Sequence, residues 1–118
     1  MEKFMLVFHS SNSAELEFNQ KSPEQIQAEI EKWNQWIGGI AAQGKLIGTE
    51  ALLPSGKVMT EGGKVVTDGP YTEGKEIVGG YLVMTAESFD EAVSLAHGCP
   101  HFEGPGNSVE VRQIMNFA

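Results

Sequence analysis

The densest group of reactive polar side chains in the sequence lies between residues 64 and 84. Asp68 precedes Gly69-Pro70, which is typical of a tight turn because Asp accepts hydrogen bonds from nearby amides and Pro fixes its own φ. A carboxylate held there could act as a general base or anchor a ligand. Tyr71 and Glu76 follow closely, and loops on a rigid scaffold often carry binding sites. We therefore predict Asp68 as a catalytic residue and Tyr71 and Glu76 as ligand contacts. In the alternative interpretation the Asp68 carboxylate only caps the turn.

Two residues elsewhere in the sequence could take part in the same chemistry. His9 follows an apolar run at 4–8, where a strand-end side chain could project into a pocket and carry a proton near neutral pH. Arg112, the only arginine, follows Glu110 in the last predicted strand. We predict His9 as a catalytic partner of Asp68 and Arg112 as a ligand contact. The alternatives are a solvated His9 and an internal ion pair between Arg112 and Glu110.

A third cluster contains residue types that bind metal ions, but the residues around it do not form a known metal-binding pattern. His97, Cys99 and His101 alternate, but Gly98 and Pro100 separate them and no second cysteine pair completes a known ligand pattern. The glycine pairs also lack the strand–turn–helix context of a phosphate-binding loop. We expect no metal site and no cofactor.

Size and charge narrow the class of protein further. A chain of 118 residues forms one domain, here 1–118. The net charge of −8 argues against binding to nucleic acid or to an anionic membrane. The single cysteine excludes an internal disulfide and suits a reducing compartment. The apolar run at 4–8 is too short for a signal peptide or a membrane span. We expect a cytoplasmic protein.

The elements that must position these residues follow a repeated plan. Uniformly apolar runs at 4–8 and 81–84 predict central strands. Two capping-box sequences, Ser22-Pro23-Glu24-Gln25 and Ser88-Phe89-Asp90-Glu91, predict the starts of two helices. The first helix carries apolar residues at helical spacing: Ile26, Ile30, Trp33, Ile37, Ile40 and Ala41. Further strands are expected from residue 46 and over 109–114. The polar segment 54–63 between them is expected to form a hairpin excursion with a short strand at 57–60.

This plan predicts a ferredoxin-like βαββαβ protomer of the α+β class. Two strand–helix–strand units with right-handed crossovers give an antiparallel sheet with both helices on one face. The central strands are apolar on both faces, so the sheet face that carries no helix must also be shielded from water. A second copy packed sheet to sheet would shield it, so we expect a homodimer that forms an α+β barrel.

At the level of motifs, the sequence resembles the YCII-related proteins. The segments VTDGPYTEGKEIVGGYLVMTAESFDEAV and SVEVRQI carry the resemblance, which is closest to the branch marked by a D-G-P-F motif, with Tyr71 at the fourth position. The resemblance implies a dimeric α+β barrel, and it implies small-molecule enzymes of mostly unassigned reaction. Some related proteins pair an aspartate with a histidine on the first helix, where this sequence has Trp33. Asp68 matches the aspartate of the motif.

Two hypotheses about function result from these observations. The first is a protein that binds a small organic ligand, or a cofactor-independent enzyme that uses acid–base chemistry, with its cleft between helix and sheet near the DGPY turn. The second is a non-catalytic interaction or regulatory module. The association of this branch with alternative sigma factors would link such a module to transcription through a protein partner.

Overall fold

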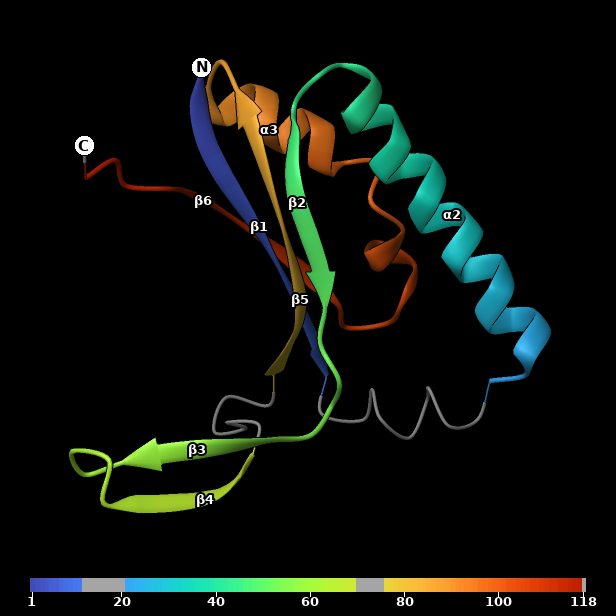
Figure 1. Ribbon diagram of the computed structural model, residues 1–118. Coiled ribbons are helices and arrows are strands. Elements are labelled where there is room, and N and C mark those ends of the chain that lie inside the picture. Colours follow the sequence, from blue (N-terminus) through green and yellow to red (C-terminus); the bar gives the residue numbers. More distant parts are fainter. Residues whose placement is uncertain (12–20, 70–75, 118) are drawn as a thin grey trace.

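The computed structural model describes residues 1–11, 21–69 and 76–117 as a four-stranded antiparallel sheet, two helices and a separate hairpin (Figure 1). The sheet has the order β2-β5-β1-β6. Its strands are β1 (Glu2–Ser11), β2 (Leu46–Ala51), β5 (Glu76–Ala86) and β6 (Ser108–Gln113). Helix α2 (Pro23–Ala42) connects β1 to β2, and α3 (Phe89–Ala96) lies between β5 and β6. The predicted ferredoxin-like α+β fold is confirmed.

The two central strands place alternate side chains on opposite faces of the sheet. Phe4 pairs with Met84 and Leu6 with Leu82, and all four side chains are buried on the face that carries the helices. Between them, Met5, Val7, Tyr81 and Val83 are only half-buried and face the other side. The core therefore lies between the helices and one face of the sheet.

Helix α2 begins and packs as its sequence predicts, but only over part of its length. Ser22 Oγ accepts a hydrogen bond from the Gln25 amide at 3.1 Å, and the Ser22 amide donates to Gln25 Oε1 at 2.8 Å, which completes the capping box. Near the other end Ile40 is buried in the core. Ile30, on the same predicted stripe, is 46% exposed. The N-terminal half of α2 diverges from the sheet (Figure 1).

Helix α3 and the segment after it close the same face of the sheet. Ser88 caps α3 by accepting from the Glu91 amide, as predicted, but the capping box is not reciprocal. The Glu91 carboxylate instead accepts from the Glu87 amide and pairs with Lys45. The predicted loop after α3 contains a 3₁₀ helix, η1 (Pro100–Glu103). This turn brings residues 100–103 beside α2.

The predicted hairpin excursion forms β3 (Gly56–Thr60) and β4 (Val65–Gly69), which pair with each other outside the main sheet. The hairpin projects away from the main sheet and the helices (Figure 1). Two of its apolar side chains are largely exposed, Met59 at 65% and Val66 at 56%. Strand β4 extends through Asp68 and Gly69, two residues that the sequence placed in a turn.

Within the described residues, no helix has both the length and the apolar character needed to cross a membrane.

The core account predicts that Leu82→Ala destabilises the protein far more than a leucine truncation outside the core. Leu82 is fully buried on β5, so its truncation should lower the free energy of unfolding by about 2–5 kcal/mol. Leu53→Ala, at a residue 82% exposed, should change it by less than about 0.5 kcal/mol. Urea denaturation of both variants measures the difference. Equal losses would contradict the assignment of the core.

Candidate functional site

The divergence of α2 from the sheet leaves a pocket of about 470 Å³, which we call the helix–sheet pocket. Its wall is formed on one side by α2 and on the other by the ends of β1, β2 and β5, with His101 of η1 between them. The described lining residues are Phe8, Ser10, Ile30, Trp33, Asn34, Ile37, Thr49, Glu50, Ala51, Gly79, Gly80 and His101. Volume and lining are typical of a small-molecule site.

Local irregularities of β1 and β5 shape the sheet side of this pocket. The pairing of the two strands shifts register between Phe8 and His9, which re-aims the following side chains. Gly80 lies so close to β2 that a Cβ there would approach the Glu50 carbonyl oxygen to 2.6 Å. Glycine is therefore required at this contact. Gly79 and Gly80 therefore line the pocket with backbone atoms alone.

Aromatic rings form the inner wall of the helix–sheet pocket. The Trp33 ring meets Phe8 edge-on at a centroid distance of 5.1 Å and Trp36 at 5.7 Å. Trp36 is itself fixed, because its Nε1 donates a hydrogen bond to the Leu95 carbonyl at 3.0 Å. The His101 ring lies 5.5 Å from Phe8 and 6.2 Å from Trp33. These contacts hold Trp33 and His101 at the boundary of the pocket.

His101 has a defined protonation pattern. Its Nε2 lies 2.8 Å from the His9 carbonyl oxygen, which can only accept, so Nε2 carries the proton. In the neutral imidazole Nδ1 is then the acceptor. Burial lowers the pKa of His101 and outweighs the hydrogen bond to the His9 carbonyl, which raises it. His101 is therefore a neutral ring with one basic nitrogen at neutral pH.

The described part of the helix–sheet pocket has no charged side chain directed into it. Its only acidic residue, Glu50, pairs across the sheet with Tyr81, on the face away from the helices. Its neighbour Thr49 uses its hydroxyl to donate to the Tyr81 carbonyl at 2.8 Å. No lysine or arginine is among the described lining residues.

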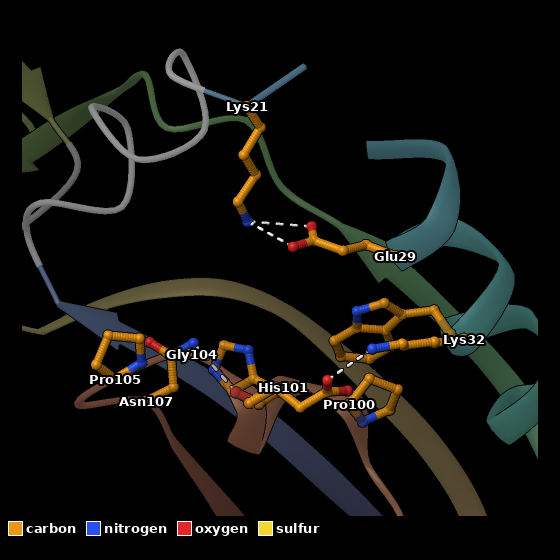
Figure 2. A pocket seen from close by; sticks show the side chains of 10 residues that line it. Lys21, Glu29, Lys32, Pro100, His101, Gly104, Pro105 and Asn107 are labelled. Carbon is orange, nitrogen blue, oxygen red and sulfur yellow. Dashed lines mark hydrogen bonds and ion pairs between the residues drawn. The ribbon is translucent and has the colours of Figure 1, made fainter. Parts of the chain in front are cut away.

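A second hollow of about 380 Å³ shares Trp33 and His101 with the helix–sheet pocket in its lining but also contains charged side chains. Figure 2 shows this second hollow. We call it the charged pocket. Lys21 pairs with Glu29 at 2.8 Å, and Lys32 pairs with Glu103 at 2.8 Å. Asn107 closes its floor by donating from Nδ2 to the His101 carbonyl at 3.1 Å. Each lysine in the described lining of this pocket, Lys21 and Lys32, therefore already faces a carboxylate.

The structure places Asp68 away from both pockets. Its side chain is 89% exposed on the projecting hairpin, where it pairs with Lys57 of the adjacent strand. Neither pocket includes Asp68 in its described lining. The carboxylate therefore forms a cross-strand ion pair, a type of contact that contributes little to stability on a surface.

His9 and Arg112 are brought together on the sheet face opposite the helices. His9 Nε2 lies 2.9 Å from Glu110 Oε1, and Arg112 Nε lies 4.0 Å from Glu110 Oε2. The predicted ion pair between Arg112 and Glu110 is thus present at the limit of contact. These residues do not share a pocket with Asp68 in the described part of the chain.

Tyr71 and Glu76 complete the set of predicted site residues. Tyr71 lies outside the described residues, and Glu76 begins β5. Among the described residues, no group of three or more His, Cys, Asp or Glu side chains is arranged to hold a metal. Burial raises the pKa of the Cys99 thiol to about 11, so this cysteine remains protonated in the core.

Sequence reasoning missed His101 and Asn34 as pocket residues. It weighed His101 only as a member of a metal cluster, and it assigned Trp33 to core packing. The sequence did contain one indication of a pocket at this end of α2. Asn34 lies one turn after Ile30, so a polar side chain shares the helix face with the apolar stripe. Nothing in the sequence indicated that η1 would bring His101 to this stripe.

The lowered pKa of His101 predicts a specific pH dependence of stability. The unfolded histidine titrates near pH ~6.5, above the folded one, so the unfolded chain takes up a proton first as the pH falls. This contribution to stability is present above that pH and is lost as the pH falls toward the folded pKa. Urea denaturation between about pH 7.5 and pH 5 should show a smaller acid loss for His101→Gln than for the parent protein. His97→Gln, at an exposed histidine, is the control. An unchanged acid loss in His101→Gln would contradict the account.

Comparisons with known proteins give one finding about ancestry. The chain matches the YCII-related domain over residues 3–118. A search of curated proteins finds no match. Because the domain match covers the chain from its third residue to its last, the protein belongs to the YCII-related family.

Proposed function

We propose that this protein binds a small organic molecule in the helix–sheet pocket. The observation that carries the proposal is the combination of about 470 Å³ of space with an aromatic wall and a few polar groups. Apolar pockets with sparse, placed polar groups are the usual form of small-molecule sites. Asn34, Ser10 and His101 supply such groups here.

The proposal centres on His101 rather than on Asp68. A general base needs a substrate within hydrogen-bond reach and an environment that excludes water. The Asp68 carboxylate is exposed and already paired with Lys57, whereas His101 is half-buried beside Trp33. If a substrate with an acidic proton binds in the helix–sheet pocket, His101 Nδ1 is a basic acceptor among the described lining residues. The expected chemistry is still cofactor-free proton transfer, but the proposed base is His101 instead of Asp68.

A pocket-filling variant with a matched control tests the location. Asn34→Phe adds a ring at the pocket wall, whereas Gln35→Phe adds the same ring next to it on α2, outside the described lining. A library of small metabolites is screened by thermal shift, since a bound ligand stabilises the folded state. Compounds that raise the melting temperature of the parent protein should lose at least about tenfold in affinity with Asn34→Phe, or about 1.4 kcal/mol. Gln35→Phe should retain them. Ligands that bind both variants equally would place the site elsewhere.

We further propose that two copies associate through the sheet face opposite the helices. Met5, Val7, Tyr81 and Val83 form an apolar strip there that no described element covers. Glu110 and Arg112 lie beside the strip, opposite Val7 and Met5. An apolar centre with a polar rim is typical of dimer interfaces. The isolated β3–β4 hairpin also needs a partner surface, because a two-stranded hairpin is marginally stable alone.

A charge placed on this strip should separate the copies. Val83→Arg puts a cation at the centre of the proposed interface, and Val93→Arg puts one on the exposed side of α3 as a control. Sedimentation should give a dimer for the parent protein and the control, and a folded monomer for Val83→Arg. Circular dichroism verifies the fold of each variant. A parent protein that sediments as a monomer would overturn the dimer.

The regulatory hypothesis is favoured by one observation, the exposed apolar side chains Met59 and Val66 on the projecting hairpin. If Met59→Glu leaves the dimer intact, this surface is free for another protein partner. Assignment to the D-G-P-F branch and a cytoplasmic location remain predictions from the sequence.

A further inference from the structure

We infer that the ligand of the helix–sheet pocket is a neutral, ring-containing molecule with a hydrogen-bond donor, and not an anion. This inference rests on the proposed function, since it names the class of molecule that the same site would take. Three independent properties of the pocket support it: its charge, its shape and the kind of polar atom it offers.

The described lining of the pocket disfavours the carboxylates and phosphates that are common among metabolites. An anion loses its hydration in a pocket, and this loss must be compensated by a cation or by several donors. The described lining has no cation. The nearest lysines, Lys21 and Lys32, lie in the charged pocket and are each paired with a carboxylate. Arg112, which the sequence predicted as a ligand contact, lies on the opposite face of the sheet beside Glu110.

The shape of the pocket favours a flat ring. Trp33 and Phe8 contact each other edge to face and both line the pocket, as does the aliphatic side chain of Ile37. A planar ring gains both buried apolar area and favourable aromatic geometry against such a wall. A flexible apolar chain would gain only the area.

Beside the Ser10 hydroxyl and the Asn34 amide, the described lining offers a ligand one basic acceptor, on His101. His101 Nε2 is occupied by the His9 carbonyl, so the ring offers Nδ1, which is unprotonated at neutral pH. A hydroxyl or amide N–H on the ligand satisfies this nitrogen. A ligand that carried only acceptors would leave Nδ1 without a donor.

Two pairs of matched probes test separately how the charge of the ligand and its hydrogen-bond donor affect binding. Benzamide and benzoate share a shape and differ in charge, whereas phenol and anisole differ in the hydroxyl donor. Binding is followed by the two tryptophan indole N–H signals in nitrogen–proton correlation spectra of the whole protein. Trp36 donates its N–H to Leu95, so its signal should stay nearly fixed, and the Trp33 signal should move. Trp33→Phe assigns the signals.

Benzamide should bind at least about tenfold more tightly than benzoate, a difference of about 1.4 kcal/mol. Phenol should bind about two- to tenfold more tightly than anisole, the usual range for one hydrogen bond. His101→Phe should remove the phenol preference and keep anisole binding. If that variant does not fold, the probe comparisons in the parent protein still decide. Benzoate binding as tightly as benzamide, or anisole as tightly as phenol, overturns the inference, as does the absence of any Trp33 shift with the neutral probes.

These outcomes differ from failure of the proposed function. If ligands of another chemical class bind the parent protein and Gln35→Phe but not Asn34→Phe, the helix–sheet pocket is still the binding site. Only the inferred class of ligand is then wrong. If no compound distinguishes those two variants, the site itself is wrong.

Discussion

The packing of the C-terminal half of α2 against the central strands determines where this protein has a pocket. Ile40 is buried in the core and Trp36 is tied to α3 through the Leu95 carbonyl, so this half of the helix is fixed. The N-terminal half then leaves the sheet at an angle (Figure 1). Trp33 lies where the two halves meet, and its ring both packs against the core and forms a wall of the pocket. A few well-packed residues thus hold the site without belonging to it.

The position of His101 in the fold determines the protonation state and the tautomer of its imidazole ring. Pro100 starts the 3₁₀ turn, and the turn brings the imidazole against Phe8 and Trp33. Burial disfavours the charged form, and the His9 carbonyl selects the tautomer. The same ring in a solvated loop would be partly protonated near neutral pH and would have no fixed acceptor. The site chemistry therefore depends on tertiary contacts of a segment far from α2 in the sequence.

Most of the fold could be predicted from the sequence because its signals are local. Apolar runs, the Ser22–Gln25 capping box and the hairpin at residues 56–69 each appear within a few neighbouring residues. The site could not be predicted in the same way. Asp68 has the residue types of a functional turn, yet it lies in a strand and pairs with Lys57, a partner that only the register of β3 and β4 reveals. His101 reaches Trp33 through contacts between distant segments, and periodicity carries no information about such contacts.

A crystallographic fragment soak shows whether ligands bind between α2 and the sheet. Crystals of the whole protein are soaked with a diverse set of small neutral and charged fragments, and the bound positions are compared. The account predicts that neutral aromatic fragments collect in the helix–sheet pocket, in contact with Trp33 and His101. Fragments that collect around Asp68 on the hairpin, or a pocket closed by Trp33 in every crystal, would contradict it.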